Sequence, residues 1–228
     1  MMQVASAQSA GDVVLALSLC SSILYGIKIR AEPSAPRTAL KAGATALLAA
    51  FAVLRTSHWQ LAPALALGSL GDAFLAWPGN QAFLCGLSSF LVAHLFYISL
   101  FARIGSGADV VLSSKSRLSL AGCVTVSAPF LGFLLIAAVA APLKIPIAAY
   151  STVILAMFLA VLTVDNNHVV LGATLFAISD SVLAVDEFLV SKNYKHRPLM
   201  QYVVWILYYA GQTSIATALQ TGAEGLKQ

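Results

Sequence analysis

Long apolar runs, each close to the length of a membrane span, occupy most of this chain and limit what it can fold into. A helix that crosses the hydrocarbon core of a bilayer needs roughly 20 mostly apolar residues. Only helices and closed barrels span lipid, because every backbone polar group there needs a partner within the protein. Eight segments are read as helices: 11–28, 38–54, 59–77, 82–103, 118–140, 143–163, 168–190 and 199–219. We therefore expect an all-α polytopic membrane protein, a bundle of about eight transmembrane helices.

Composition agrees with this expectation and limits the classes of molecule that the protein could bind. The chain is 59% hydrophobic and 10% charged, whereas a soluble domain carries about 25% charged residues. The eight segments use most of the 228 residues, so we expect one transmembrane domain over 1–228, surrounded by membrane lipids. The net charge of +4 comes from scattered residues, which gives nucleic-acid binding no support. Every helix is apolar enough to face lipid or protein, so both a monomer and a homo-oligomer stay open.

Cysteine and histidine spacing does not predict a metal site. The three cysteines fall inside expected helices at unrelated spacings: Cys20, Cys85 and Cys123. We expect them to be small buried residues, without a disulfide framework. Three histidines fall at expected helix ends, away from His94: His58, His168 and His196. A three-histidine zinc site is therefore not expected.

Two aspartates lie within apolar runs, and each opens the same short pattern. Asp72 begins Asp-Ala-Phe-Leu-Ala, and Asp180 begins Asp-Ser-Val-Leu-Ala. A charged side chain at membrane depth costs on the order of 3 kcal/mol or more, so such a residue is a functional candidate. The copies are four helices apart, which points them the same way through the membrane. Asp72 lies thirteen residues into the segment 59–77 and Asp180 twelve residues into 168–190, so similar depth is expected. If the carboxyls meet, repulsion and desolvation favour one protonated acid and one carboxylate, the arrangement that general acid catalysis uses.

Two other interpretations of the aspartates remain open at this point. Paired acids in a transporter or channel bind cations or relay protons along a path through the membrane. Such a path often has Gly or Pro breaks, and near Asp72 only Gly68 and Gly71 qualify. In a scaffold or lipid-binding protein the aspartates would be structural, and Asn would be tolerated at both positions.

Other polar side chains inside the expected helices could support a site. His94 and Tyr97 are three residues apart and share one helix face, where His94 either is structural or orients a carboxylate or water. Four more side chains favour a polar cavity over an interfacial anchor: Tyr150, Tyr208, Tyr209 and Gln212.

Three further residues each have two interpretations. Ser69 and Ser179 lie close to the aspartates in sequence, and either hydroxyl could instead bond the backbone of its helix. Lys41 opens the second expected helix, where it either reaches anionic lipid headgroups or meets the phosphate of a lipid substrate.

Several of these residues fall within blocks that resemble the lysoplasmalogenase (YhhN-like) family of membrane proteins. The first block reads Gly71-Asp72-x-x-Leu75, then Phe83-x-x-Gly86-Leu87-x-x-Phe90-x-x-Ala93-His94-x-x-Tyr97. The later blocks are Ala148-Ala149-Tyr150, Gly172-Ala173-x-x-Phe176-x-x-Ser179-Asp180-x-x-Leu183-Ala184, and Tyr208-Tyr209-x-x-Gln212. The resemblance covers the third to eighth expected helices in order and is loose around Lys41. Tyr202 and Trp205 depart from the family's smaller or aliphatic residues, which predicts a reshaped tail pocket.

The resemblance implies a hydrolase that cleaves the vinyl ether bond of lysoplasmalogens. The substrate would be an alkenyl lysophospholipid, and the products a fatty aldehyde and glycerophosphocholine or glycerophosphoethanolamine. It implies that Asp72 and Asp180 are the family's two aspartates, that no cofactor is required, and that a eukaryotic member lies in the endoplasmic reticulum membrane. Acid catalysis suits the reaction, since protonating the alkene gives an oxocarbenium ion that water captures, as in two-carboxylate glycosidases.

Overall fold

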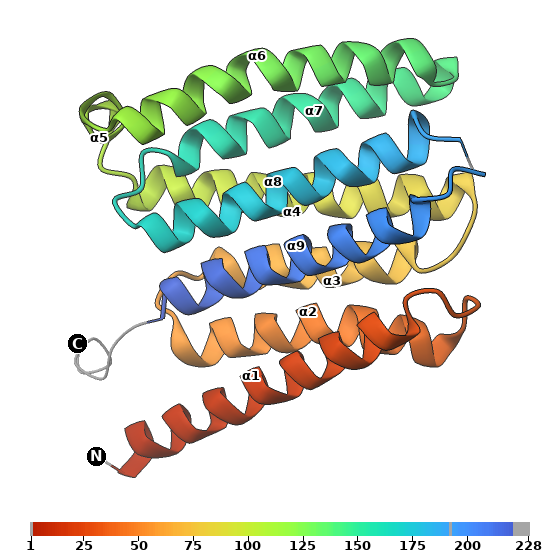
Figure 1. Cartoon of the computed structure of the whole chain (residues 1–228). Helices are drawn as coiled ribbons and strands as arrows, with labels where there is room; N and C mark the ends of the chain where they lie inside the picture. The colour runs from red at the N-terminus through yellow and green to blue at the C-terminus, as the bar shows by residue number, and fades with distance from the viewer. Residues whose placement is uncertain (1, 192, 221–228) are drawn as a thin grey trace. The chain divides into compact units, whose positions relative to one another are not determined.

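The structure is a computed structural model that describes residues 2–191 and 193–220, with side chains from residue 9 onward. All regular elements in this part of the chain are helices. They are α1 (Met2–Lys28), α2 (Ala35–Arg55), α3 (Leu61–Leu75), α4 (Asn80–Ile104), α5 (Ala108–Ser113), α6 (Lys115–Ala138), α7 (Ala141–Val161), α8 (Asn167–Phe188) and α9 (Arg197–Ala218). Each of the eight expected segments coincides with one long helix, which confirms the all-α membrane fold (Figure 1). The short α5, in the connection after α4, was not expected.

Six of the described helices are long and apolar enough to cross a membrane. They are α1 (from Ser9), α2, α4, α6, α7 and α8. Helix α3 is apolar but has 15 residues, fewer than the roughly 20 that a span needs. Helix α9 has 22 residues and is not among the six. The chain is an integral, multi-pass membrane protein, and the crossing of α3 and α9 stays a prediction.

The helix boundaries follow from local sequence. Pro36 and Pro142 lie in the first turns of α2 and α7, where a missing backbone N–H costs nothing. The Asn166 side chain accepts the His168 N–H at 3.0 Å and so caps α8. Helix α3 ends at Leu75 because Pro78 and the positive φ of Gly79 follow it closely. Its end leaves Asp72 in the last turn of a helix shorter than the expected 59–77.

The chain divides into two compact units. Residues 1–97 and 212–228 form the first, residues 98–211 form the second, and the boundaries fall inside α4 and α9. In the first unit, α1 packs along α2 and α2 packs along α3 (Figure 1). The α1–α2 contact is close because small side chains line it. Ser18 Oγ donates to Ala44 O at 2.6 Å, and Ser21 Oγ donates to Leu40 O at 2.9 Å.

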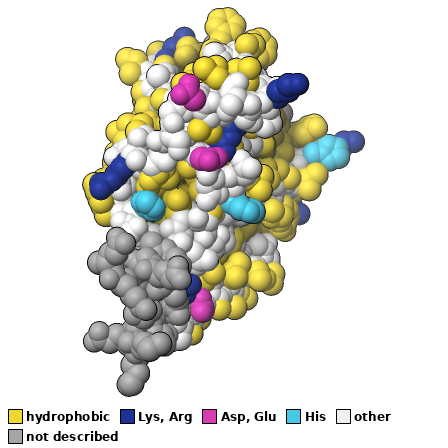
Figure 2. Space-filling model, turned by 90° about the vertical axis from the view of Figure 1, so that its left-hand side faces the viewer, with side chains coloured by type: hydrophobic (Ala, Val, Ile, Leu, Met, Phe, Trp, Pro, Cys, Tyr) yellow, Lys and Arg dark blue, Asp and Glu magenta, His cyan; other side chains and the backbone are white. Residues whose placement is uncertain are grey.

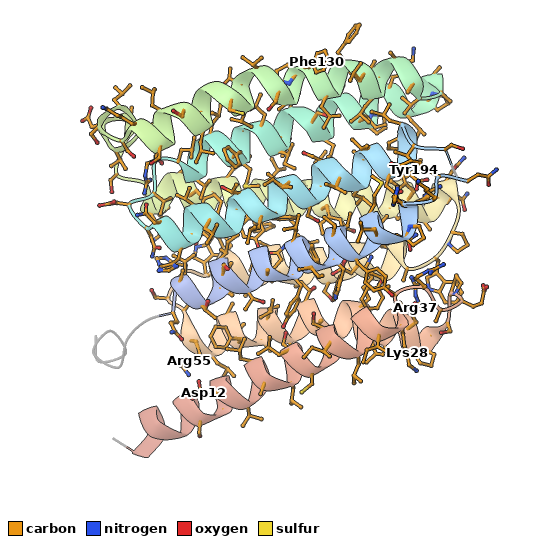
Figure 3. The ribbon with its side chains drawn as sticks, viewed as in Figure 1. Asp12, Lys28, Arg37, Arg55, Phe130 and Tyr194 are labelled. Carbon is orange, nitrogen blue, oxygen red and sulfur yellow. The ribbon has the colours of Figure 1, made fainter. Side chains whose placement is uncertain are left out.

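Two arginines fix the ends of α2 in the first unit. Near its start, Arg37 donates to Ala76 O (3.1 Å) just after α3 and to Ile29 O (2.9 Å) just after α1. At its end, Arg55 Nη1 pairs with Asp12 Oδ1 at 2.8 Å. Figure 3 shows these arginines at opposite ends of the helix. Arg37 thus satisfies carbonyl groups that follow two helix ends, whereas Arg55 pairs with a carboxylate within α1.

Two arginines also link helices within the second unit. Helix α7 packs against α6 and α8. Arg117, at the start of α6, is buried and donates to Leu162 O (2.7 Å) and to Asn167 Oδ1 (2.9 Å), which ties α6 to the α7–α8 turn. Arg197 Nε lies 3.0 Å from Asp186 Oδ1 and links the first turn of α9 to the last turns of α8.

Many helix surfaces carry exposed apolar side chains, as a lipid-facing surface should. On α6, Phe130 is 63% exposed and points away from its helix (Figure 3). On the face drawn in Figure 2, hydrophobic side chains are widely exposed and the described Lys and Arg side chains lie apart from one another. The expectation that Cys20, Cys85 and Cys123 are buried is wrong, because each lies on an exposed helix surface. A small apolar thiol is tolerated there because the surrounding solvent is hydrocarbon.

Candidate active site

Asp72 lies in a buried polar centre between α2 and α3. Its Oδ1 is 3.5 Å from the Lys41 ammonium, and its Oδ2 accepts a 2.8 Å hydrogen bond from Thr45 Oγ1. The Asp72 side chain is 3% exposed and the Lys41 side chain 13%. These three residues are called the Asp72 centre below. It is a paired carboxylate whose two oxygens each face a donor from the neighbouring helix.

Local sequence explains why this centre forms. Lys41 and Thr45 are four residues apart on α2, so they occupy one helix face. Ser69, one turn before Asp72, donates its Oγ to Ala42 O at 2.7 Å and holds α3 against α2. Ser69 thus bonds a neighbouring helix and does not bond its own backbone, which was the alternative that the sequence left open.

Gly71 lets the ring of Phe90 approach α3 beside Asp72. A Cβ atom at position 71 would lie 2.6 Å from Phe90 Cε2, a distance that real Cβ atoms essentially never show. Gly71 thus leaves room for the Phe90 ring beside α3, and a side chain at position 71 would force that ring to shift.

Asp180 lies in a second polar centre, between α7 and α8. The Tyr150 hydroxyl donates to Asp180 Oδ2 at 2.6 Å. Both side chains are half-buried, and they are called the Asp180 centre below. Ser179, which precedes the aspartate, donates to Val204 O of α9 at 2.9 Å, so it too bonds a neighbouring helix. Tyr150 is a neutral hydroxyl donor, whereas Lys41 brings an ammonium group to Asp72.

Three more of the predicted residues are fully buried in the first unit. The Tyr97 hydroxyl makes a short hydrogen bond to Gln212 Oε1, which joins α4 to the end of α9. His94 Nδ1 lies 2.6 Å from Phe90 O, one turn earlier in its own helix. A neutral imidazole with Nδ1–H donating to this carbonyl keeps its Nε2 as an acceptor.

Tyr208 and Tyr209 belong to a buried aromatic cluster of the second unit. The Trp205 ring stacks on Tyr209 with centroids 5.8 Å apart and packs tilted against Tyr208 at the same distance. Tyr208 also meets Phe176 edge to face at 5.6 Å. Tyr208 and Tyr209 therefore pack in an aromatic cluster with Trp205 and Phe176, and the polar cavity stays a prediction.

The structure joins six of the predicted site residues in pairs that the sequence analysis did not foresee, and it reveals residues that the analysis missed. Lys41 meets Asp72, Tyr150 meets Asp180, and Tyr97 meets Gln212. Each unit contains one carboxyl centre, so the joint action of the two aspartates stays a prediction. Thr45 was missed, although its position four residues after Lys41 was a usable signal. Arg37 was also missed, because a capping role depends on loops that no periodicity reveals.

No metal-ligand cluster was found in the described residues, where no three or more His, Cys, Asp or Glu side chains gather as an ion would need. Lys41 does not extend toward headgroups as its first interpretation supposed, since its ammonium lies against Asp72 in a mostly buried position. Its meeting with a substrate phosphate remains untested.

Comparison with known proteins places this arrangement in a family. The sequence model of the YhhN family matches residues 36–219, which include α2 to α9 and both carboxyl centres. Lysoplasmalogenase TMEM86B of Mus musculus is 34% identical over 158 residues, 69% of this chain and 62% of that protein. Lysoplasmalogenase of Mycobacterium bovis is 32% identical over 201 residues, 82% of this chain and 71% of that protein.

The match to human TMEM86B is similar, at 31% identity over 152 residues, which are 67% of this chain and 59% of that protein. The matched part thus spans about three fifths of the length of the mammalian relatives. No solved structure matches the chain. The extent of the family match and the agreement among these relatives show that the chain belongs to the YhhN family.

Proposed function

We propose that this protein is a lysoplasmalogenase that hydrolyses the vinyl ether bond by acid catalysis with Asp72 and Asp180. The observation that carries the proposal is the pair of carboxyl centres, each held by donors from a neighbouring helix, in a chain whose relatives are named lysoplasmalogenases. The substrate would be an alkenyl lysophospholipid with a choline or ethanolamine headgroup. The products would be a fatty aldehyde and the corresponding glycerophosphodiester.

The first chemical step needs a proton on carbon. In a vinyl ether, the oxygen lone pair pushes electron density onto the outer alkene carbon. A carboxylic acid gives its proton to that carbon, the π pair forms the new C–H bond, and an oxocarbenium ion remains next to oxygen. Proton transfer by a positioned acid typically contributes about 10²–10⁴-fold to the rate.

The second carboxyl group completes the reaction. Its carboxylate stabilises the oxocarbenium ion and takes a proton from the water that attacks it, which yields a neutral hemiacetal. It then returns that proton to the glycerol oxygen as the C–O bond breaks, while the first carboxylate takes the hemiacetal hydroxyl proton. One water is consumed, and both groups regain their starting protonation, as in glycosidases that use two carboxylates.

The remaining buried polar residues fit supporting roles in this proposal. His94 keeps an acceptor nitrogen that can hold a water, and Tyr97 with Gln212 fixes α4 against α9. Tyr150 orients Asp180. Tyr208 and Tyr209, packed with Trp205, would form a wall of the pocket for the alkenyl tail and would not contact the reacting atoms.

In a eukaryotic cell we place the protein in the endoplasmic reticulum membrane.

Aldehyde release tests the proposal directly. The purified protein in detergent, with chelator present, is given an alkenyl lysophospholipid and, in a parallel reaction, the matching acyl lysophospholipid. We expect aldehyde from the first and no hydrolysis of the second, because an ester carbonyl offers no alkene carbon to protonate. Absence of aldehyde from folded wild-type protein would exclude the proposal and favour a proton- or cation-coupled transporter that uses the same aspartates.

A further inference from the structure

The ends of α1 and α3 and the start of α2 meet around the Arg37 guanidinium in the first unit. Its Nη1 donates to Ala76 O at 3.1 Å, just after α3, and its Nη2 donates to Ile29 O at 2.9 Å, just after α1. The guanidinium carbon also lies 5.4 Å from the centroid of the buried Tyr25 ring. These three helix ends are called the α1–α3 junction below. The contacts hold the half-buried Arg37 side chain in one place.

The contacts of Arg37 satisfy hydrogen-bond donors but leave its positive charge without a carboxylate partner. The two carbonyl groups and the Tyr25 hydroxyl are neutral dipoles, which offset only part of a full charge. Within the part of the chain that the structure describes, the buried Nε–H of Arg37 has no hydrogen-bond acceptor and Arg37 makes no ion pair. Charges held away from bulk water are usually paired. Arg37 is therefore a fixed cation that an anion from outside the chain would complement.

A second cation lies one turn further along the same face of α2. Lys41 follows Arg37 by four residues, about 6 Å along the helix axis, and its side chain is 13% exposed. Lys41 is paired with Asp72, whereas Arg37 adds a further positive charge. Arg37 and Lys28 lie at the same end of the first unit (Figure 3). The junction and its flanks thus contain four basic side chains and two acidic ones: Lys28, Arg30, Arg37 and Lys41, with Glu32 and Asp72.

Phosphate is the anion that fits these donors best. A planar guanidinium binds two phosphate oxygens side by side, and an ammonium adds a point charge beside them. Helix α2 supports the same choice, because its first turn contains no acidic residue and the Ser34 side chain makes no capping hydrogen bond. At a membrane surface, phospholipid headgroups are the main source of phosphate.

We propose that Arg37, with Lys41, binds the phosphodiester of the lysophospholipid substrate and so restricts turnover to lipids with a phosphate-bearing headgroup. The identity of the lipid rests on the proposed function, whereas the need for a phosphate does not. In such a lipid only the glycerol backbone separates the phosphodiester from the ether oxygen, a span comparable to the helical turn between Arg37 and Lys41. A phosphate at Arg37, with the lipid running along α2, brings the vinyl ether to the level of Asp72.

Competition for binding tests the phosphate site without any turnover. The probe is a radiolabelled alkyl ether lysophosphatidylcholine in detergent micelles, whose saturated ether has no alkene to protonate. We expect wild-type protein to bind it saturably. The alkylglycerol of the same chain length, which lacks the phosphate, should compete roughly 10-fold to 100-fold less well than the unlabelled probe. Equal competition by the two would overturn the proposal.

Phosphatidylglycerol distinguishes the substrate from bulk anionic lipid as the source of the phosphate. We expect it to displace the probe poorly at equal mole fraction, because a lipid held only by its phosphate lacks the contacts of the ether chain near Asp72. Displacement as strong as that by the unlabelled probe would mean that the site binds bulk anionic lipid. That result would overturn the assignment to the substrate.

Substitution of Arg37 tests the residue itself. Arg37→Gln removes the charge and keeps an amide donor for a junction carbonyl, and it should bind the probe roughly 10-fold to 100-fold more weakly. Arg37→Lys should lose less, since it keeps the charge without the planar fork. Arg30→Gln, at an exposed cation of the same junction, is the matched control and should bind like wild type. Unchanged affinity in folded Arg37→Gln would overturn the role of Arg37, and if that variant does not fold, the wild-type competition decides.

Turnover by the same proteins separates the phosphate site from the proposed function. Arg37→Gln should raise KM for the alkenyl lysophospholipid with kcat little changed, because the phosphate contact is the same in the ground state and the transition state. A fall in kcat with KM unchanged would mean that Arg37 acts on the chemical step and would overturn the binding role. If wild type releases no aldehyde yet binds the probe through Arg37, the proposed function fails while the phosphate site stands.

Discussion

The Asp72 and Asp180 centres begin from the same five-residue pattern and end in different chemical environments. Asp72 is enclosed by α2, which supplies a cation and a hydroxyl, whereas the bond from α7 to Asp180 is made by a tyrosine hydroxyl. In both places the serine near the aspartate bonds a neighbouring helix backbone. The comparison teaches that the helix before the motif, and not the motif itself, supplies the side chains that bond each carboxyl.

The largest expected effect is on turnover. Asp72→Asn and Asp180→Asn should each lower kcat for aldehyde release by about 10²–10⁴-fold, since each removes one proton-transfer step. The double variant should be little worse than either single variant, because groups that act as a unit are not additive. Initial rates of aldehyde formation measure all three. Effects of the two substitutions that multiply in the double variant would show that the centres act independently.

The free energy of unfolding should fall by different amounts when the aspartate of each centre is replaced by asparagine. Asp72→Asn leaves the mostly buried Lys41 ammonium without its counter-charge and should cost about 3 kcal/mol of unfolding free energy. Asp180→Asn keeps an acceptor for the Tyr150 hydroxyl and should cost about 1 kcal/mol or less. Reversible unfolding in mixed micelles measures both. Equal losses for the two variants would contradict a stabilising contact between Lys41 and Asp72.

Two closely packed glycines, Gly71 and Gly211, should differ in how much stability an alanine substitution costs. At Gly211, a Cβ would lie 2.7 Å from Gly172 O and 2.9 Å from Phe176 N, so two helix backbones would have to move. At Gly71, the obstacle is the Phe90 ring, which can shift more easily. We expect losses near 3 kcal/mol for Gly211→Ala and about 1–2 kcal/mol for Gly71→Ala, by unfolding in micelles.

Gly122→Ala is the control for this pair. A Cβ there meets nothing within 4 Å, and alanine favours helix over glycine by about 1 kcal/mol. The variant should be as stable as wild type or slightly more so. A loss at Gly122 equal to that at Gly211 would mean that close packing does not explain the cost of alanine at Gly71 and Gly211.

The smallest expected effect compares the two hydroxyl donors. Tyr150→Phe and Thr45→Val each remove one hydrogen bond to a carboxyl, worth about 1 kcal/mol. Thr45→Val should be the milder change for turnover, because Lys41 still orients Asp72, whereas Tyr150→Phe removes the bond that orients Asp180. We expect kcat to fall about threefold and about tenfold, respectively. The reverse order in steady-state kinetics would contradict the described orientation of the centres.

Apolar periodicity and length were enough to predict the fold. Eight runs gave the eight long helices, because burial of backbone polar groups in lipid leaves few alternatives. Boundaries were less predictable where a turn intervened: α3 ends at Leu75, and α5 lies in a connection expected to be irregular. The exposed cysteines show the same limit, since an apolar side chain in a membrane helix can face either protein or lipid.

The candidate site was predictable in its residues and not in its contacts. Charge at membrane depth identified Asp72 and Asp180, and the family pattern added Tyr150. That Lys41 pairs with Asp72 could not be read from sequence, because a lysine near a helix start reaches headgroups more often than a neighbouring helix. Thr45 belongs to none of the sequence blocks. Its spacing from Lys41 indicated a shared helix face, but its hydrogen bond to Asp72 depends on how α2 packs against α3.

The most direct measurement of the central claim is product analysis after turnover in D₂O, with the aldehyde reduced immediately so that its exchangeable hydrogens are fixed. Acid catalysis by the aspartate pair predicts a single deuterium on the carbon next to the former aldehyde carbon, since the proton added to the alkene comes from a solvent-exchanged carboxyl. It also predicts no product from the acyl lipid and little from Asp72→Asn or Asp180→Asn. Aldehyde without deuterium at that carbon, or no aldehyde from folded wild-type protein, would contradict the account.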